Sequence, residues 1–281
     1  MIKLLITDLD DTLYSWIGFF VPAFYGMAEE LSHILKKEKN LLLDEYRKIH
    51  QEKGSVEYPY ATIHLPSVKR AYPGFTQEEL LKELNPAFHK FNSIRKKQLQ
   101  LYPYVKETLN KLVEMDIKIV GYTESAEENG FYRLKKLEVD ELFQRVYVSY
   151  SQFERPNHIP SSAKTEIVLG KKPNPKLIKQ ICEHESVSID EAIYIGDSMT
   201  KDIYMAKTAG VTSVLYKHPS DPQIAEDLYD KLVAISHWTK ADFQHDIELR
   251  AICKDSKFQP DYVIDSFDLL IKIIKTINNI A

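Results

Sequence analysis

Two aspartates near the start of the chain have the spacing of a catalytic acid pair. Asp8 ends the β-branched run 3–8, and Asp10 follows two residues later. Side chains two apart on an extended chain point the same way, so both carboxylates can face one ligand. One of them can attack phosphorus and form an aspartyl-phosphate. The other can protonate the leaving oxygen and later take a proton from water. An acidic turn that only ends a strand remains the alternative.

A second acidic pair, Asp197 and Asp202, follows the apolar run 192–196, in which Gly196 permits a tight turn. If Asp197 lies beside the first acid pair, three carboxylates gather, and they repel one another strongly unless a cation is present. Oxygen ligands of this kind suit Mg²⁺ completed by water and a substrate phosphate. For Asp202, direct metal ligation, a place behind the ligands and a helix N-terminal acid all remain open.

A hydroxyl and a lysine complete the set of candidate residues. Thr123 ends the run 117–123, and the backbone N–H groups of the turn after it, including that of Glu124, can bind phosphate oxygens. Lys172, chosen over Lys171 because it directly precedes Pro173, stands at a helix start, where the dipole disfavours a cation unless an anion binds beside it. A helix-capping threonine and a solvated lysine remain the alternatives.

These residues fall at the junctions of alternating strand-like and helix-like segments. Six short β-branched runs predict strands at 3–8, 117–123, 145–150, 192–197, 211–216 and 261–265. Helical patterns lie between or after them at 104–115, 126–137, 175–185, 200–209 and 266–278. This alternation predicts an α/β fold with a doubly wound, mainly parallel sheet, in which ligands bind beyond the carboxyl ends of the strands.

A long interruption of this pattern predicts a second domain. Residues 16–98 contain amphipathic helical stretches and no convincing strand. We therefore expect a discontinuous α/β catalytic core over 1–15 and 99–281, with a helical domain over 16–98 inserted after the first strand. We expect 151–170 to be a long loop. Residues 217–260 have a helical pattern of their own, and the sequence assigns them no role.

Composition limits the classes of function. The net charge of −4 and the pI near 6.2 argue against a nucleic-acid or anionic-membrane surface. The two cysteines are too few for a disulfide framework, and the apolar start is cut short by Asp8 before a secretory signal can form. We expect a soluble cytoplasmic protein. The absence of HExxH and GxSxG patterns gives no support to zinc hydrolysis or Ser-His catalysis.

The order of these motifs resembles the haloacid dehalogenase (HAD) superfamily. The matching positions are Asp8-x-Asp10-x-Thr12, Thr123, Lys172-Pro173 and Gly196-Asp197 with Asp202. The resemblance covers 1–15, about 100–216 and the last strand and helix. It implies a Rossmann-like core, and it implies that the helical insertion is an α-helical cap that selects substrate.

The resemblance also implies roles for the residues. Asp8 would be the nucleophile and Asp10 the general acid/base, and Thr123 and Lys172 would hold the phosphoryl group. Mg²⁺ would be bound by the Asp8 carboxylate, the Asp10 main-chain carbonyl and Asp197. Dehalogenating members lack the second acid of the first motif, so the presence of Asp10 favours phosphoryl transfer.

We therefore expect a Mg²⁺-dependent phosphatase that hydrolyses a small phosphorylated metabolite through an aspartyl-phosphate intermediate. A phosphomutase of the same family uses the same acid pair and remains an alternative. A non-catalytic phospho-acceptor module is another, although Asp10 and the large helical insertion count against it.

Overall fold

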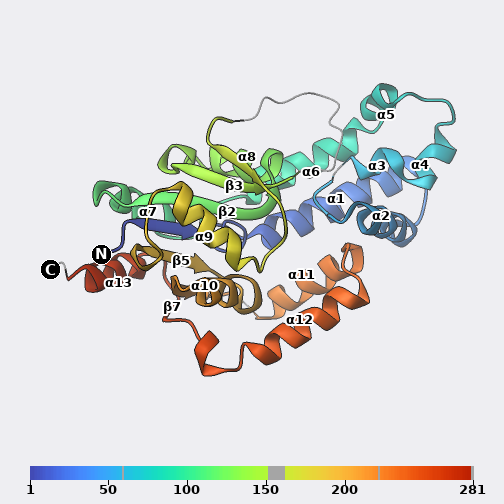
Figure 1. Ribbon diagram of the computed structural model, residues 1–281. Helices are drawn as coiled ribbons and strands as arrows, with labels where there is room; N and C mark the ends of the chain where they lie inside the picture. The colour runs from blue at the N-terminus through green and yellow to red at the C-terminus, as the bar shows by residue number, and fades with distance from the viewer. Residues whose placement is uncertain (59, 151–161, 221, 280–281) are drawn as a thin grey trace. The chain divides into compact units, whose positions relative to one another are not determined.

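In the computed structural model, which describes residues 1–58, 60–150, 162–220 and 222–279, a seven-stranded parallel sheet carries the predicted motifs (Figure 1). Its order is β4-β3-β2-β1-β5-β6-β7, and each neighbouring pair is parallel. The strands are β1 (Leu4–Thr7), β2 (Lys118–Ala126), β3 (Arg145–Ser149), β4 (Thr165–Val168), β5 (Ala192–Gly196), β6 (Thr212–Tyr216) and β7 (Tyr262–Ile264). The predicted α/β class with a doubly wound parallel sheet is confirmed.

Strand β4 is the one described strand that the sequence missed. It lies within 151–170, which we expected to be a loop, so that prediction was wrong for 165–168; residues 151–161 lie outside the described part of the chain. The physical reason is that β4 is an edge strand: it pairs with β3, and its Ile167 remains 52% exposed. Such a strand lacks the continuous apolar pattern of strands that are buried on both faces.

Helices cover both faces of the sheet. All four residues of β1 are buried although successive side chains point to opposite faces. On one face, Leu4 and Ile6 join a core cluster with α9 and α10, which pack on each other (Figure 1). On the other, α7 contacts β2 and α13. The helices of this unit are α7 (Val105–Glu114), α8 (Glu127–Lys136), α9 (Pro175–His184), α10 (Tyr204–Ala209) and α13 (Leu269–Asn278), with short turns η1 (Asp140–Leu142), η2 (Ile189–Glu191), η3 (Met199–Ile203) and η4 (Ser256–Phe258).

The chain divides into two compact units, and the second one is helical. The α/β unit comprises 1–15, 100–219 and 244–281, and the helical unit comprises 16–99 and 220–243. The helices of the helical unit are α1 (Trp16–Leu35), α2 (Lys39–Lys53), α3 (Ala61–His64), α4 (Pro66–Ala71), α5 (Gln77–Glu83), α6 (Asn85–Gln98) and α11 (Pro222–Ile235). Helix α12 (Lys240–Ile252) begins in this unit and continues into the α/β unit.

Residues 220–243 correct the expected boundaries, which left them in the α/β core. Helix α11 packs on α1 and α2. The Tyr25 hydroxyl donates to the Lys231 carbonyl at 3.0 Å, and His50 Nδ1 lies 2.7 Å from the Ile235 carbonyl oxygen. These contacts join residues 206 and 185 positions apart, so periodicity within either segment could not reveal them. Within the described residues, no helix has the length and hydropathy that a bilayer span requires.

Candidate active site

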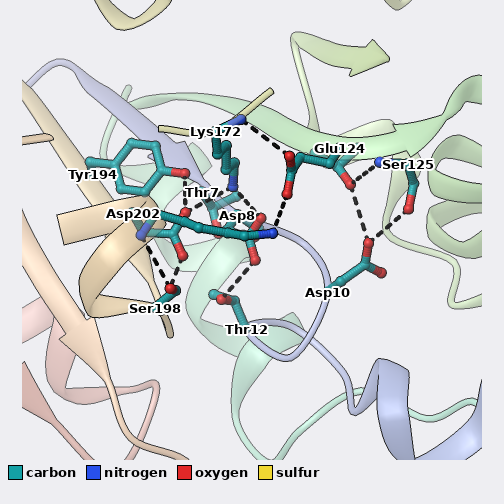
Figure 2. Close-up of polar contacts among 12 residues, drawn as sticks. Thr7, Asp8, Asp10, Thr12, Glu124, Ser125, Lys172, Tyr194, Ser198 and Asp202 are labelled. Atoms are coloured by element: carbon teal, nitrogen blue, oxygen red, sulfur yellow. Dashed lines mark hydrogen bonds and ion pairs between the residues drawn. The ribbon is translucent and has the colours of Figure 1, made fainter. Parts of the chain in front are cut away.

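Asp8 lies at the carboxyl end of the central strand β1. Its backbone N–H donates to the Ile195 carbonyl at 2.9 Å, which continues the pairing with β5 beyond the end of the strand. The side chain is buried, and its two oxygens have different partners (Figure 2). The Thr12 hydroxyl donates to Oδ2 at 3.1 Å, and Lys172 Nζ donates to Oδ1 at 2.5 Å. The carboxylate is therefore fixed in orientation between a hydroxyl and a cation.

Lys172 joins two carboxylates inside the protein. Its ammonium lies 2.5 Å from Asp8 Oδ1 and 2.8 Å from Asp202 Oδ1, and its side chain is only 3% exposed. The rings of Tyr122 and Tyr194 lie beneath it, with centroids 4.8 and 5.7 Å from Nζ. Burial alone would lower the pKa of Lys172, but the attraction of Asp202 and Asp8 raises it above its ordinary value. Lys172, the lysine that the sequence predicted for the site, therefore stays charged and lies directly beside Asp8.

Asp202 has a donor for each of its oxygens. Oδ1 accepts from Lys172 and from the Tyr194 hydroxyl at 2.8 Å, and Oδ2 accepts from the Ser198 backbone N–H at 3.1 Å (Figure 2). The π-helical turn η3 carries Asp202 back over Gly196. Its geometry is that of a carboxylate that holds Lys172 in place.

Asp8, Asp197 and Asp202 form a cluster that suits a hard cation. One carboxylate oxygen from each lies within 4.8 Å of the others. Burial, against the attraction of Lys172, raises the pKa of Asp8 well above its ordinary value. Desolvation of the carboxyl, the largest cause, and repulsion from Asp202 and Asp11, the next, raise the pKa of Asp197 to about 8. Part of the Asp197 residue is exposed to solvent. All-oxygen donors whose ionised forms need a further positive charge fit Mg²⁺.

Asp10 is held by a different group of donors. Its Oδ2 accepts from the hydroxyls of Ser125 at 2.9 Å and Thr123 at 3.2 Å, and its Oδ1 accepts from Arg133 Nη1 at 2.7 Å. Figure 2 shows its carboxylate facing Ser125. Strand β1 ends at Thr7, and Asp11, directly after Asp10, takes a left-handed φ of 59°. The two carboxylates of the predicted acid pair thus have separate hydrogen-bond partners.

Thr123 and Glu124 lie within β2, which runs on to Ala126 with a register shift between Tyr122 and Ala126. The Thr123 hydroxyl accepts from the Ser125 N–H at 3.0 Å, and the helix that begins at Glu127 has no side-chain cap, so the helix-cap alternative for Thr123 does not hold. The Glu124 carboxylate accepts from the Lys172 backbone N–H at 3.2 Å and from Lys201 Nζ at 2.5 Å. It thereby ties the strand to both lysines.

Sequence reasoning missed Arg133, Ser125 and Tyr194. Arg133 lies in α8 and is 4% exposed, on the same buried face as Gly130 and Leu134. A charged residue at the i+3 position of an apolar helix face was the available signal, because an arginine is almost never buried without a partner. Tyr194 lay inside a predicted strand, and nothing in its spacing distinguished a hydrogen-bonding tyrosine from a core aromatic.

The fold and the site together define a class: a doubly wound parallel α/β protein with an acidic site at the carboxyl ends of its central strands. Residues 5–216 match the family described as haloacid dehalogenase-like hydrolase. This match covers most of the chain, so the protein belongs to that family and is an enzyme. The predicted membership of the HAD superfamily is confirmed.

Curated relatives support a phosphatase type of hydrolase. The chain is 28% identical over 219 residues to a glyceraldehyde 3-phosphate phosphatase of Methanopyrus kandleri. This match covers 76% of this chain and 83% of that protein. It is 25% identical over 219 residues to the protein of the same name from Pyrococcus abyssi, with 78% and 82% covered.

Among solved structures, a 2-haloacid dehalogenase from Pseudomonas syringae is similar with a TM-score of 0.54 at 19% identity, and the match covers 98% of this chain and 99% of that one. A HAD phosphatase from Thermococcus onnurineus is similar with a TM-score of 0.52 at 19% identity, over 97% and 98% of the two chains. At this identity the likeness supports the fold and not the reaction.

Proposed function

We propose that this protein is a Mg²⁺-dependent phosphatase that hydrolyses a small phosphorylated metabolite through an aspartyl-phosphate at Asp8. The observation that carries the proposal is the Asp8 carboxylate, fixed at the end of β1 by Thr12 and Lys172 beside the Asp197 and Asp202 carboxylates. An oriented carboxylate next to a buried cation can attack a phosphate ester while the approaching negative charge is balanced.

The first step breaks the ester and the second restores the enzyme. An Asp8 oxygen forms a bond to phosphorus, the P–O bond to the leaving group breaks, and Asp10 gives its proton to the leaving oxygen. Asp10, now a carboxylate, takes a proton from water as the water oxygen attacks phosphorus and the bond from Asp8 to phosphorus breaks. Phosphate and free Asp8 result, so atoms and protons balance over the cycle.

The other residues of the site stabilise charge. Lys172 would balance the phosphoryl oxygens, and Thr123 with the backbone N–H of Glu124 would donate to them. Asp8, Asp197 and the main-chain carbonyl of Asp10 would hold Mg²⁺, which when bound supplies positive charge to the carboxylates and the phosphate. We assign Asp202 to holding Lys172, because its two oxygens already accept from the lysine, a tyrosine and a backbone N–H.

The relatives and the helical unit support a substrate class. The two relatives are named for glyceraldehyde 3-phosphate, so a three-carbon sugar phosphate is the first substrate to test. The helical unit of 16–99 and 220–243 would act as the cap that selects substrate. The structural likeness to a dehalogenase does not change the assignment, because Asp10 is present and is held by three donors.

A screen of phosphorylated metabolites tests the proposal. Purified protein is incubated with Mg²⁺ and with each of a panel of sugar phosphates, including glyceraldehyde 3-phosphate, and parallel samples contain EDTA. We expect free phosphate that disappears with EDTA and returns with excess Mg²⁺. An isomerised sugar phosphate without free phosphate would indicate the phosphomutase instead. A phosphoryl group that stays on the protein without turnover would indicate the phospho-acceptor module.

A further inference from the structure

Arg133 is a buried cation that the reaction described above does not use. It lies in α8, and its side chain is 5% exposed. Its Nη1 donates to Asp10 Oδ1 at 2.7 Å and to the Ser125 hydroxyl oxygen at 3.0 Å. The Ser125 hydroxyl in turn donates to Asp10 Oδ2 at 2.9 Å. The guanidinium therefore binds Oδ1 of Asp10 directly and is linked to Oδ2 through the Ser125 hydroxyl. Together these contacts fix both the position and the plane of the Asp10 carboxyl.

The Thr123 hydroxyl shows why the contacts of Arg133 and Ser125 with Asp10 matter. Its single proton is directed to Asp10 Oδ2 at 3.2 Å. A hydroxyl has one donor proton, so Thr123 cannot donate to Asp10 and to a phosphoryl oxygen at the same time. When a substrate phosphoryl group takes this donor, a lone pair of Asp10 is released, at which the carboxyl can carry a proton. Arg133 and Ser125 still donate to the carboxyl and keep it in place (Figure 2 shows Ser125 against Asp10).

We propose that Arg133 is a positioning residue for proton transfer: it holds the Asp10 carboxyl, with Ser125, in the place from which Asp10 protonates the leaving oxygen and later deprotonates water. This proposal rests on the proposed function, which makes Asp10 the acid/base. An arginine that only stabilises the fold would affect all substrates alike. A positioning arginine affects a substrate in proportion to its need for a proton.

Two substrates separate these roles. An alkyl phosphate such as glyceraldehyde 3-phosphate has a basic leaving oxygen and needs the proton from Asp10. The p-nitrophenolate of p-nitrophenyl phosphate is a stable anion and leaves without one. For Arg133→Met we expect kcat/KM for the alkyl phosphate to fall by about 10²-fold, the cost of a misplacement of about 1 Å. We expect kcat/KM for the aryl phosphate to fall by less than about tenfold, since that step does not use the proton.

The aryl substrate also gives a kinetic signature. Hydrolysis of the phosphoenzyme still needs Asp10 to take a proton from water, so in Arg133→Met this step becomes slow. We expect a burst of p-nitrophenolate close to one per active site, followed by a low kcat with a lowered KM. Arg133→Lys keeps the charge and should recover part of both alkyl-phosphate turnover and phosphoenzyme hydrolysis. Equal losses of kcat/KM for the two substrates, with no burst, would overturn the proposal.

Arg145→Met is the matched control. Arg145 is also an arginine of the α/β unit with a carboxylate partner, Glu185, at 3.1 Å, and it has no part in the site described above. We expect this variant to leave the ratio of the two kcat/KM values at that of the wild type. A change of the ratio as large as in Arg133→Met would show that any lost ion pair produces the effect, and would overturn the proposal.

The failure of this proposal is distinguishable from that of the proposed function. If the wild-type protein releases no phosphate from either substrate with Mg²⁺, the function itself is wrong and the assignment of Arg133 is rejected with it. If the wild type is active and Arg133→Met is as active on both substrates, only the positioning role is wrong. Should Arg133→Met not fold, Arg133→Lys and Ser125→Ala carry the test, and unchanged substrate ratios in both would reject the role.

Discussion

The backbone of Gly196 lies against the side chain of Asp202. A Cβ built on Gly196 would lie 2.4 Å from Asp202 Cγ and 2.5 Å from Oδ2, closer than side chains approach one another. Asp202 in turn accepts from Lys172, which contacts Asp8. The glycine at the end of β5 is thus the first member of a chain of contacts that ends at the proposed nucleophile.

Replacement of Gly196 by alanine should disconnect this chain. The added methyl group must push Asp202 away, and Lys172 would then lose the carboxylate that fixes it. We expect kcat/KM to fall by about 10²-fold, comparable with the loss of one preorganised charge-stabilising donor. Overpacking should also lower the free energy of unfolding by about 1–3 kcal/mol. Phosphate release and urea unfolding measure the two effects. Wild-type kcat/KM in Gly196→Ala would show that the position of Asp202 does not matter.

Tyr194→Phe tests the same chain more gently. It removes the hydroxyl that donates to Asp202 Oδ1 and leaves Lys172 and the Ser198 N–H in place. We expect a loss of about 1 kcal/mol in stability and a fall in kcat/KM of about tenfold or less. Tyr147→Phe is the control, because it removes a similar tyrosine-to-carboxylate hydrogen bond, 2.9 Å to Glu185. The control should lose stability and keep kcat/KM; equal kinetic losses in both variants would contradict a specific role for Tyr194.

Asp8→Asn should abolish turnover. An amide cannot attack phosphorus as a carboxylate does, and the similar shape of asparagine preserves the contact with Thr12. We expect no phosphate release above background and a circular-dichroism spectrum like that of the wild type. The exposed Asp190→Asn serves as a control for a lost carboxylate. Residual turnover by Asp8→Asn at a measurable fraction of the wild-type rate would remove Asp8 from the role of nucleophile.

Asp10→Asn should slow turnover without removing the nucleophile. Loss of a general acid/base typically costs about 10²–10⁴-fold in rate. The amide would still accept a hydrogen bond from Arg133, so the variant should fold. Rapid-quench measurement of acid-precipitable phosphate on the protein, with an alkyl phosphate as substrate, reads the slowed first step. An unchanged rate would mean that another group transfers the proton.

The sequence predicted which residues lie at one edge of the sheet, because a parallel sheet brings the ends of its strands together. Asp8, Thr123 and Asp197 lie on or directly after β1, β2 and β5, which are neighbours in the sheet. Once the strands were recognised, their order along the chain was enough to place these residues at one edge. Lys172 does not follow a predicted strand, and its unusual place at a helix start was the signal that identified it. In the structure it contacts Asp8.

The remaining features depend on tertiary contacts that leave no local pattern. The place of Arg133 on an apolar helix face could suggest a buried partner, but it could not identify that partner as the Asp10 carboxylate 123 positions away. Residues 220–243 join the helical unit through packing on α1 and α2, and no periodicity within them shows that partner. Local sequence reports which face of an element is apolar; it does not report which element covers that face.

His50 gives the helical unit a dependence on pH. It is fully buried in α2, and its Nδ1 lies 2.7 Å from the Ile235 carbonyl oxygen, so that nitrogen must carry the proton of the neutral ring. Among the described residues, Nε2 has no hydrogen-bond partner. Burial, with a smaller contribution from His237, lowers the pKa of His50 from 6.5 to about 4.

Between pH 6.5 and pH 4 the unfolded chain therefore binds a proton at His50 that the folded chain does not. Stability from this residue is complete above pH 6.5 and is lost as the pH falls toward 4. From these values, moving from neutral pH to about pH 5 should cost about 2 kcal/mol. His50→Gln cannot titrate and should lose that much less over the same change. Both tryptophans, Trp16 and Trp238, lie in the helical unit, so urea unfolding followed by tryptophan fluorescence reports this unit directly. If wild type and His50→Gln lose stability equally on acidification, His50 is not the group that titrates.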